Sequence, residues 1–276
     1  MKKYLIVIFV FATFLFSCES EPFVEEEEEE EFVERVFDGN VRLLTQEEVN
    51  TFGAEEYTII NGNLIIGDRF IEDIDIFDLT PLRSIRRLNS GTLKISGCNL
   101  LTSLNGLHNV ESIHNFRLEY CNSIENLTDL ESLTEIGNEL GVSIYVWVLH
   151  NDSLQSLRGL EALGRTRDLA IGGNPLLHDF DGLNNVIELG SFIFGWNDGL
   201  ENIDALSNLM LVEYLQTYIG CESATVLCKI GNTSLTNFCG LQNLFVSGVY
   251  DPDNIDIRFN EFNPSIEEII IGDCSF

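Results

Sequence analysis

The chain has 276 residues, of which 45% are hydrophobic, so it can bury the core of one or two domains. Fifteen Lys and Arg stand against 45 Asp and Glu, which gives a formal net charge of −30. This acid excess argues against nucleic-acid binding, which needs clustered cations, and against adsorption on anionic lipid.

The first seventeen residues have the composition of a signal peptide. Lys2 and Lys3 precede an almost unbroken apolar run from Tyr4 to Phe16. That run is short for a membrane span and suits the hydrophobic region of a signal peptide. Residues 15–18, Leu-Phe-Ser-Cys, resemble a bacterial lipobox, which implies cleavage before Cys18 and lipidation of Cys18. A plain secretory signal that happens to end beside a Cys is the alternative.

A strongly acidic segment follows. Between Glu19 and Asp38 there are eleven acids and one Arg, and seven consecutive Glu occupy residues 25–31. Like charges repel one another, so we expect residues 18–42 to form a disordered tether. Acids directly after a lipidated Cys also resemble the surface-export signal of Bacteroidetes lipoproteins. That resemblance implies an outer-membrane lipoprotein facing the cell exterior, whereas a tether without a sorting role is the alternative.

Residues 43–276 carry an internal repeat. Its ladder positions hold Asn or Cys at spacings of 23, 30, 23, 23 and 35, namely Cys98, Cys121, Asn151, Asn174, Asn197 and Asn232. Each ladder residue is accompanied by seven positions, at −5, −3, +3, +6, +9, +12 and +15. Apolar residues fill 39 of these 42 positions, the exceptions being Thr166, Lys229 and Ser247. A composition of 45% hydrophobic residues would supply about nineteen by chance.

The repeat predicts stacked coils. Apolar residues two apart before the ladder predict a short strand with one face inward. The period of three after the ladder predicts short strands and 3₁₀ turns rather than a long helix. Ladder Asn side chains can bond backbone groups and one another, and Cys can fill the same buried position. Because one coil cannot bury its own apolar side, the coils must stack into a continuous core.

Several features resemble a known family: the Leu-x-Ile strands, the Asn/Cys ladder, the Gly-Leu pairs whose Leu is at position +9, and the opening Ile-Ile-Asn-Gly-Asn-Leu-Ile-Ile at 59–66. They are similar to leucine-rich repeats and, more closely, to the receptor L domain. The resemblance covers about residues 43–274. It implies a mainly β fold, a right-handed β-helix-like or leucine-rich-repeat-like solenoid of the receptor L-domain type.

Both ends of the repeat have the features expected at the ends of a solenoid. Residues 45–48, Thr-Gln-Glu-Glu, have a capping-box pattern and predict a short capping helix that runs to about Phe52. The run 64–66 predicts the first strand of an atypical coil. Near the C-terminus, two further strand-ladder motifs are predicted at Ile255, Ile257 and Asn260 and at Ile269, Ile271 and Cys274.

Six Cys remain after Cys18. Cys98 and Cys121 occupy adjacent ladder positions, and we expect buried thiols there because the position is shared with Asn; a bond between them is the alternative. A disulfide within the trio Cys221, Cys228 and Cys239 is compatible with an oxidising compartment. Pairing among this trio and Cys274 stays open, since sequence alone does not determine connectivity.

Neither a catalytic centre nor a cofactor or metal site is expected. The four His fall at different repeat positions, at His108, His114, His150 and His178, and the chain carries no nucleophile elbow or phosphate loop. Two sets of acids are spaced like calcium ligands but lack the Gly and distant Glu of an EF-hand, at Asp73, Asp75 and Asp78 and at Asp251, Asp253 and Asp256. Solvated turn acids are the favoured interpretation. Ser153 lies in an Asp-Ser-Leu sequence that resembles a Bacteroidetes O-glycosylation site.

Strand positions −4, −2 and −1 should face outward, and both Trp of the chain fall on this face. The candidate ligand-binding residues there are Lys94, Arg117, Tyr120, Trp147, His150 and Trp196. Trp, Tyr and Arg dominate interface hot spots, so this face is the predicted binding surface, and coverage by a flanking loop is the alternative. We therefore expect a non-catalytic surface lipoprotein that binds a protein, peptide or glycan. A structural or adhesion component, or a β-helix polysaccharide-acting enzyme, are the competing functions.

Overall fold

The computed structural model describes residues 34–137, 144–220 and 229–276. The predicted signal peptide, the lipidation site Cys18 and residues 18–33 of the tether lie outside the described residues, as do Cys221 and Cys228. The chain from Glu34 to Phe276 forms one compact unit.

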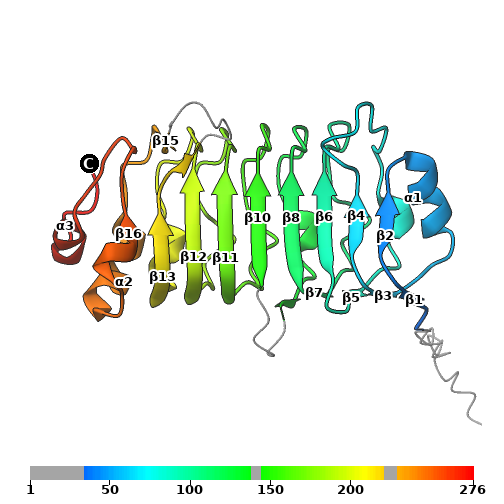
Figure 1. Cartoon of the computed structure of the whole chain (residues 1–276), viewed down its shortest axis with the longest axis horizontal. Helices are drawn as coiled ribbons and strands as arrows, with labels where there is room; N and C mark the ends of the chain where they lie inside the picture. Colours follow the sequence, from blue (N-terminus) through cyan, green and yellow to red (C-terminus); the bar gives the residue numbers. More distant parts are fainter. Residues whose placement is uncertain (1–33, 138–143, 221–228) are drawn as a thin grey trace, which may run out of the picture. The chain divides into compact units, whose positions relative to one another are not determined.

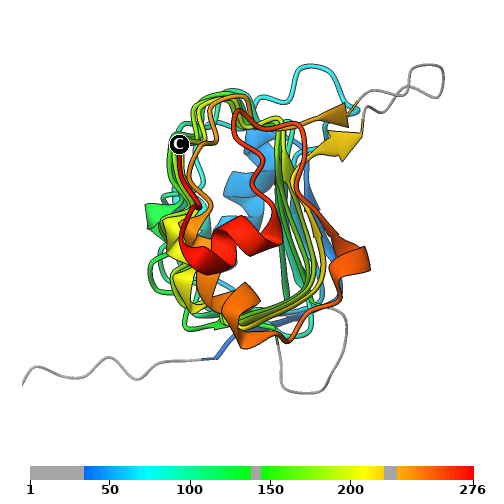
Figure 2. The same ribbon diagram turned by 90° about the vertical axis from the view of Figure 1, so that its left-hand side faces the viewer.

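Two long, all-parallel sheets run along this unit, and they confirm a mainly β solenoid (Figure 1). The larger sheet has nine strands, which are, from one end to the other, β2 (Val41–Leu43), β4 (Leu64–Ile66), β6 (Thr92–Ser96), β8 (Asn115–Glu119), β10 (Tyr145–Leu149), β11 (Arg165–Gly172), β12 (Glu188–Gly195), β13 (Leu211–Gln216) and β16 (Ile255–Asp256). The smaller sheet has five, which are β1 (Val36–Asp38), β3 (Ile59–Asn61), β5 (Arg87–Leu88), β7 (Ser112–Ile113) and β9 (Glu135–Ile136). Seen along the solenoid axis, successive strands superpose in a flat wall (Figure 2).

Helices and turns close the coils. The period of three predicted 3₁₀ turns, and the structure has them as η1 (Thr80–Leu82), η2 (Thr128–Leu130), η3 (Asp204–Asn208), η4 (Cys239–Leu241) and η5 (Pro252–Asn254). The predicted capping helix is α1 (Gln46–Gly53), and Thr45 Oγ1 accepts its first hydrogen bond from the Glu48 N–H at 3.2 Å. Two further helices, α2 (Gln242–Ser247) and α3 (Ile266–Ile271), lie at the C-terminal end, where β14 (Ile219–Gly220) and β15 (Lys229–Ile230) form an antiparallel pair.

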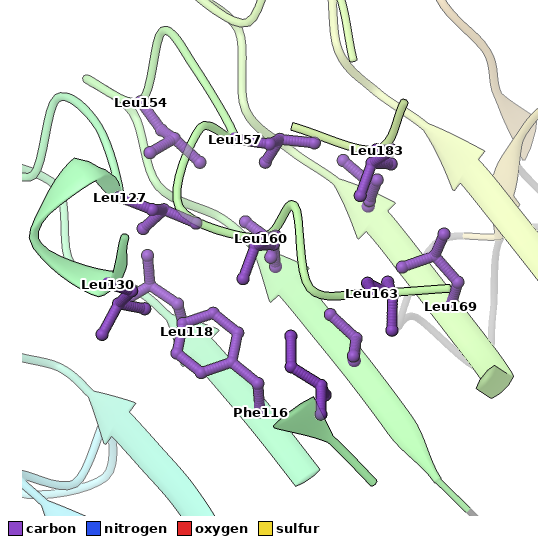
Figure 3. Close-up of a cluster of buried hydrophobic side chains, with 14 of the residues drawn as sticks. Phe116, Leu118, Leu127, Leu130, Leu154, Leu157, Leu160, Leu163, Leu169 and Leu183 are labelled. Carbon is purple, nitrogen blue, oxygen red and sulfur yellow. The ribbon is translucent and has the colours of Figure 1, made fainter. Parts of the chain in front are cut away.

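The apolar repeat positions form one continuous core. Figure 3 shows the side chains of a central region pointing inward from both walls of the coils, and those from one coil are Leu154, Leu157, Leu160 and Leu163. These four side chains are at most 1% exposed. Gly159 lies in this coil with φ +113, and a Cβ there would come within 1.9 Å of the Leu127 carbonyl oxygen of the coil before it. Close stacking of the coils therefore requires a Gly at this turn.

The Asn ladder forms as predicted. Asn174 Nδ2 donates to the carbonyl of Val148 at 3.0 Å and to Asn197 Oδ1 at 3.2 Å, while Asn174 Oδ1 accepts from the N–H and the Nδ2 of Asn151 at 3.1 Å. The same pattern continues from Asn197 to Asn232 and on to Asn260. The ladder thus satisfies buried backbone groups at the corner where each strand ends.

Cys98 and Cys121 are free, fully buried thiols at the start of the ladder, as predicted. Burial, reinforced by the neighbouring Cys98, raises the pKa of the Cys121 thiol well above its usual value. Because both thiols are buried where iodoacetamide does not reach them, we expect the reagent to leave both Cys unmodified in the folded protein and to modify both in denaturant. Peptide mapping by mass spectrometry measures this, and alkylation of either residue before unfolding would contradict it.

Three predictions about boundaries need correction. The tether was predicted to reach residue 42, yet β1 pairs with β3 and β2 pairs with β4, so the solenoid begins before residue 43. For the coil that leads to Asn232, the repeat pattern placed the strand directly before Asn232, at residues 227–229. Its strand is β13, which pairs with β12, and the insertion follows that strand. This explains why the polar Lys229 could stand at a strand position in the repeat pattern.

The third correction concerns the last strand-ladder motif, because Ile269 and Ile271 lie on α3. Ser265 and Glu268 form a capping box that starts this helix. Residues two apart point to different sides of a helix, so Ile269 is buried whereas Ile271 is 78% exposed. Cys274 pairs with Cys239 in a disulfide that joins the end of the chain to η4. Cys239 therefore has a partner outside the trio in which a bond was predicted.

Candidate binding surface

The predicted −4 residues form one row across the outer face of the nine-stranded sheet. The strand register pairs Lys94 with Arg117, Arg117 with Trp147 and Trp147 with Ala170, and the row continues to Ile193. All five are half-buried. The side chains alternate along each strand, and residues on either side of each row member, such as Phe116 and Leu118, belong to the core. The sequence therefore placed Lys94, Arg117 and Trp147 side by side correctly.

A buried carboxylate organises these cations. The Glu119 side chain is 5% exposed, and it lies two residues from Arg117 on the same face of β8. Arg117 Nε donates to Glu119 Oε1 at 3.2 Å, its Nη2 contacts the same oxygen, and Lys94 Nζ lies 3.8 Å from Glu119 Oε2. A buried charge is tolerated only with such partners. We call Lys94, Arg117, Glu119 and Trp147 the sheet cluster.

Trp147 completes the sheet cluster through its ring. The guanidinium carbon of Arg117 lies 4.4 Å from the centroid of Trp147, a cation–π arrangement. On the same strand, the Tyr145 ring centroid lies 5.4 Å from that of Trp147, and the Tyr145 hydroxyl is 2.9 Å from Thr92 Oγ1. Trp147 is thus held between Arg117 and Tyr145. A ligand would meet an indole whose orientation is already set.

The loop after β4 adds a second carboxylate beside the sheet cluster. Asp68 pairs with Arg42 at 2.7 Å. The hydrogen bond from the Phe70 N–H lowers the pKa of Asp68, and Arg42 and Lys94 lower it further. Asp68 therefore stays ionised and interacts with Lys94 as well as with Arg42. Sequence reasoning missed both Glu119 and Asp68; for Glu119 the signal was an acid two residues from Arg117, which the period of a strand puts on the same face.

The −1 residues lie at a corner just beyond the strands rather than within the sheet. The strand register makes five of them equivalent on consecutive coils, and we call them the corner row: Gly97, Tyr120, His150, Gly173 and Trp196. All have left-handed backbone conformations, with φ of 72°, 56°, 57°, 68° and 59° in that order. Gly adopts this conformation without strain, whereas a residue with a side chain pays roughly 1–2 kcal/mol for it.

The aromatic members of the corner row contact one another. Tyr120 and His150 stack with centroids 4.6 Å apart, and His150 meets Trp196 at 5.4 Å in a T-shaped arrangement. The coil of Gly173 lies between those of His150 and Trp196, and a Cβ on Gly173 would come within 2.6 Å of His150 Nδ1. The absence of a side chain at Gly173 therefore lets the rings on either side meet. The predicted binding residues thus form two groups, the sheet cluster and the corner row.

The other candidate positions have structural partners. Asp75 accepts a hydrogen bond from the Gln46 N–H, Asp78 from the Thr80 N–H and Asp251 from the Asp253 N–H. These are turn and cap contacts, and the described residues contain no group of three His, Cys, Asp or Glu side chains placed to hold a metal ion. Ser153 is half-buried in the turn after the ladder residue Asn151.

A hollow of about 570 Å³ lies away from these residues, beside α1. Its aromatic wall consists of Phe37, Phe52 and Tyr57, whose ring centroids are 5.3 to 5.5 Å apart. Glu47 and Glu55 also line it. It contains none of the predicted binding residues, and the rings pack the capping helix against the first coil.

Comparison of the chain with protein-family models, with curated proteins and with solved structures finds no match. Across the described ranges, no helix is both long and apolar enough to cross a membrane.

Proposed function

We propose that this protein is a non-catalytic, lipid-anchored surface protein that binds its ligand on the outer face of the nine-stranded sheet. The observation that carries the proposal is the sheet cluster. In a chain of net charge −30, Lys94 and Arg117 lie side by side on neighbouring strands, fixed by Glu119 and next to Trp147. Side chains that are ordered before binding lose little conformational entropy when a ligand arrives, which favours affinity.

The cluster has the composition of a recognition site rather than a catalytic one. Arg and Trp are enriched among the residues that dominate binding energy. Both cations of the cluster are already paired with Glu119 and expose about a quarter of their side chains, 24% for Lys94 and 25% for Arg117. Such groups can form hydrogen bonds with a protein, peptide or glycan while keeping their charges compensated.

The proposal extends to the family and the cellular address. Kinship with the receptor L domain is supported by the Asn ladder and by the Leu-x-Ile strands. Lipid anchoring at the outer membrane is supported by the lipobox-like sequence at 15–18 and by the acids after it. External protease added to intact cells should remove the protein from the surface, and full protection would contradict surface display.

Replacing Trp147 by Ala tests the binding surface. We expect the affinity for a ligand identified on a glycan array or by pull-down to fall about 30-fold, the effect of losing a hot spot of roughly 2 kcal/mol. Phe276→Ala is a suitable control, because Phe276 is an exposed aromatic residue outside the sheet cluster. Equal affinity of the Trp147→Ala variant and the control would remove the sheet cluster from the binding site.

A further inference from the structure

The corner row keeps aromatic residues where the backbone favours Gly. Two of its positions hold Gly, at Gly97 and Gly173, which shows that Gly suits this corner. Tyr120 and His150 regain stability by stacking face to face. Trp196 also meets His150, edge to face, but it stays 41% exposed, so less of its side chain is packed. Packing within the chain therefore offsets the cost of the left-handed backbone less well at Trp196 than at Tyr120 and His150. The large indole stays open to solvent while its backbone is strained.

Over other aromatic rings of this outer surface lies an Arg side chain of the same chain. The Arg69 guanidinium lies between the rings of Tyr120 and Phe70, at 4.7 and 4.6 Å from their centroids. Phe259, which precedes the ladder residue Asn260 with φ 65°, has Arg258 at 5.7 Å. Two corner aromatics thus have a cation of their own.

Trp196 differs from them in this respect. Over its ring, no Lys or Arg lies among the described residues. Trp is the aromatic side chain that attracts cations most strongly. Within this part of the chain, the indole of Trp196 is therefore available to a cation from outside.

The charge around Trp196 also favours a cation. Asp152 and Asp198 are exposed, each two residues after a member of the corner row and directly after a buried ladder Asn. The folded part belongs to a chain of net charge −30, so a cationic partner would be attracted to this edge and an anionic one repelled. An exposed acid two residues from an open indole favours the binding of a guanidinium or ammonium group there.

We propose that Trp196 receives an Arg or Lys side chain of a partner protein, in the way that Tyr120 receives Arg69. This inference rests on the proposed binding function and names the chemistry of the ligand: a cationic protein segment. The strands that carry the sheet cluster end at the corner row, so one partner can contact both groups.

The test needs a signal local to Trp196, because the Glu run at 25–31 also attracts cations. The chain has two Trp, so its nitrogen-15 spectrum has two indole signals, and the spectrum of Trp196→Gly assigns them. The full chain is titrated with a nine-residue Arg-Gly-Gly repeat peptide and with the same peptide carrying citrulline, which keeps the shape of Arg without its charge. We expect a saturable shift of the Trp196 signal with the Arg peptide, and at least tenfold weaker binding of the citrulline peptide.

Trp196→Gly also separates binding from folding. Gly relieves the left-handed strain, so the thermal midpoint should stay equal or rise, whereas Trp196→Ala should lower it. Calorimetry should show that Trp196→Gly lowers the affinity for the Arg peptide at least fivefold. An unshifted Trp196 signal, or equal shifts of that signal with both peptides, would overturn the proposal. If a ligand sensitive to Trp147→Ala is then still bound, the proposed function stands and only the cationic partner is lost.

Discussion

Replacing Asn174 by Ala is expected to lower the free energy of unfolding by about 3–5 kcal/mol, since each buried group left without a partner costs roughly 1–3 kcal/mol. The substitution removes the bond to the Val148 carbonyl and leaves the Asn151 N–H without its acceptor. It also breaks the amide chain to Asn197. Domains have a total stability of about 5–15 kcal/mol, so urea denaturation should show the change clearly.

Asn174→Cys is the matched control for this substitution. Cys already fills the equivalent position in two coils, where the Cys121 Sγ lies 3.5 Å from the Glu119 carbonyl oxygen. A thiol fills more of the space than a methyl group and donates weakly, so we expect a loss about 1 kcal/mol smaller than with Ala. If Asn174→Ala unfolded at the same urea concentration as the unmodified protein, the ladder would contribute nothing to stability.

The repeat and the sheet register were predictable because they depend on local physics. A ladder residue with apolar positions at fixed offsets can be buried in only one register, since a shift by one residue would expose every inward side chain. This is why Lys94, Arg117 and Trp147 could be placed side by side from their offsets alone, and the strand pairing confirms it.

The ends were harder to predict because local signals compete there. Ile269 and Ile271 fit a strand period, yet Ser265 and Glu268 cap a helix, and the disulfide from Cys239 to Cys274 holds that end in place. At the other end, the acidic composition masked Val41, which is 5% exposed in β2. A net charge over twenty residues says little about a strand of three.

Contacts across the candidate site were the least predictable. Arg69 reaches Tyr120 from the loop after β4, and no periodicity relates the two residues. The left-handed conformation of the corner row had a sequence signal in Gly97 and Gly173, but only the strand register shows that Tyr120, His150 and Trp196 share it. The sequence alone therefore identified the shared row of Lys94, Arg117 and Trp147, but neither Glu119 nor the contacts between the side chains.

The sheet cluster makes the second large prediction. Arg117→Ala is expected to lower the free energy of unfolding by about 2–3 kcal/mol, less than the roughly 3–5 kcal/mol of a fully buried pair because Arg117 and Lys94 are partly exposed. The loss arises because the Glu119 carboxylate stays buried with only Lys94, at 3.8 Å, to compensate it. Loss of the contact with the Trp147 ring adds to it.

A double-mutant cycle with Glu119→Gln identifies the cause. Alone, Glu119→Gln should cost about 1 kcal/mol, because the amide keeps its size and still accepts a hydrogen bond from Arg117. In the Arg117→Ala background the same change removes a buried charge that only Lys94 compensates, so the double variant should be more stable than Arg117→Ala alone. Urea denaturation of the four proteins measures the coupling. Additive losses would mean that Glu119 is not electrostatically tied to Arg117, and the cations of the proposed binding surface would then lack the carboxylate that fixes them.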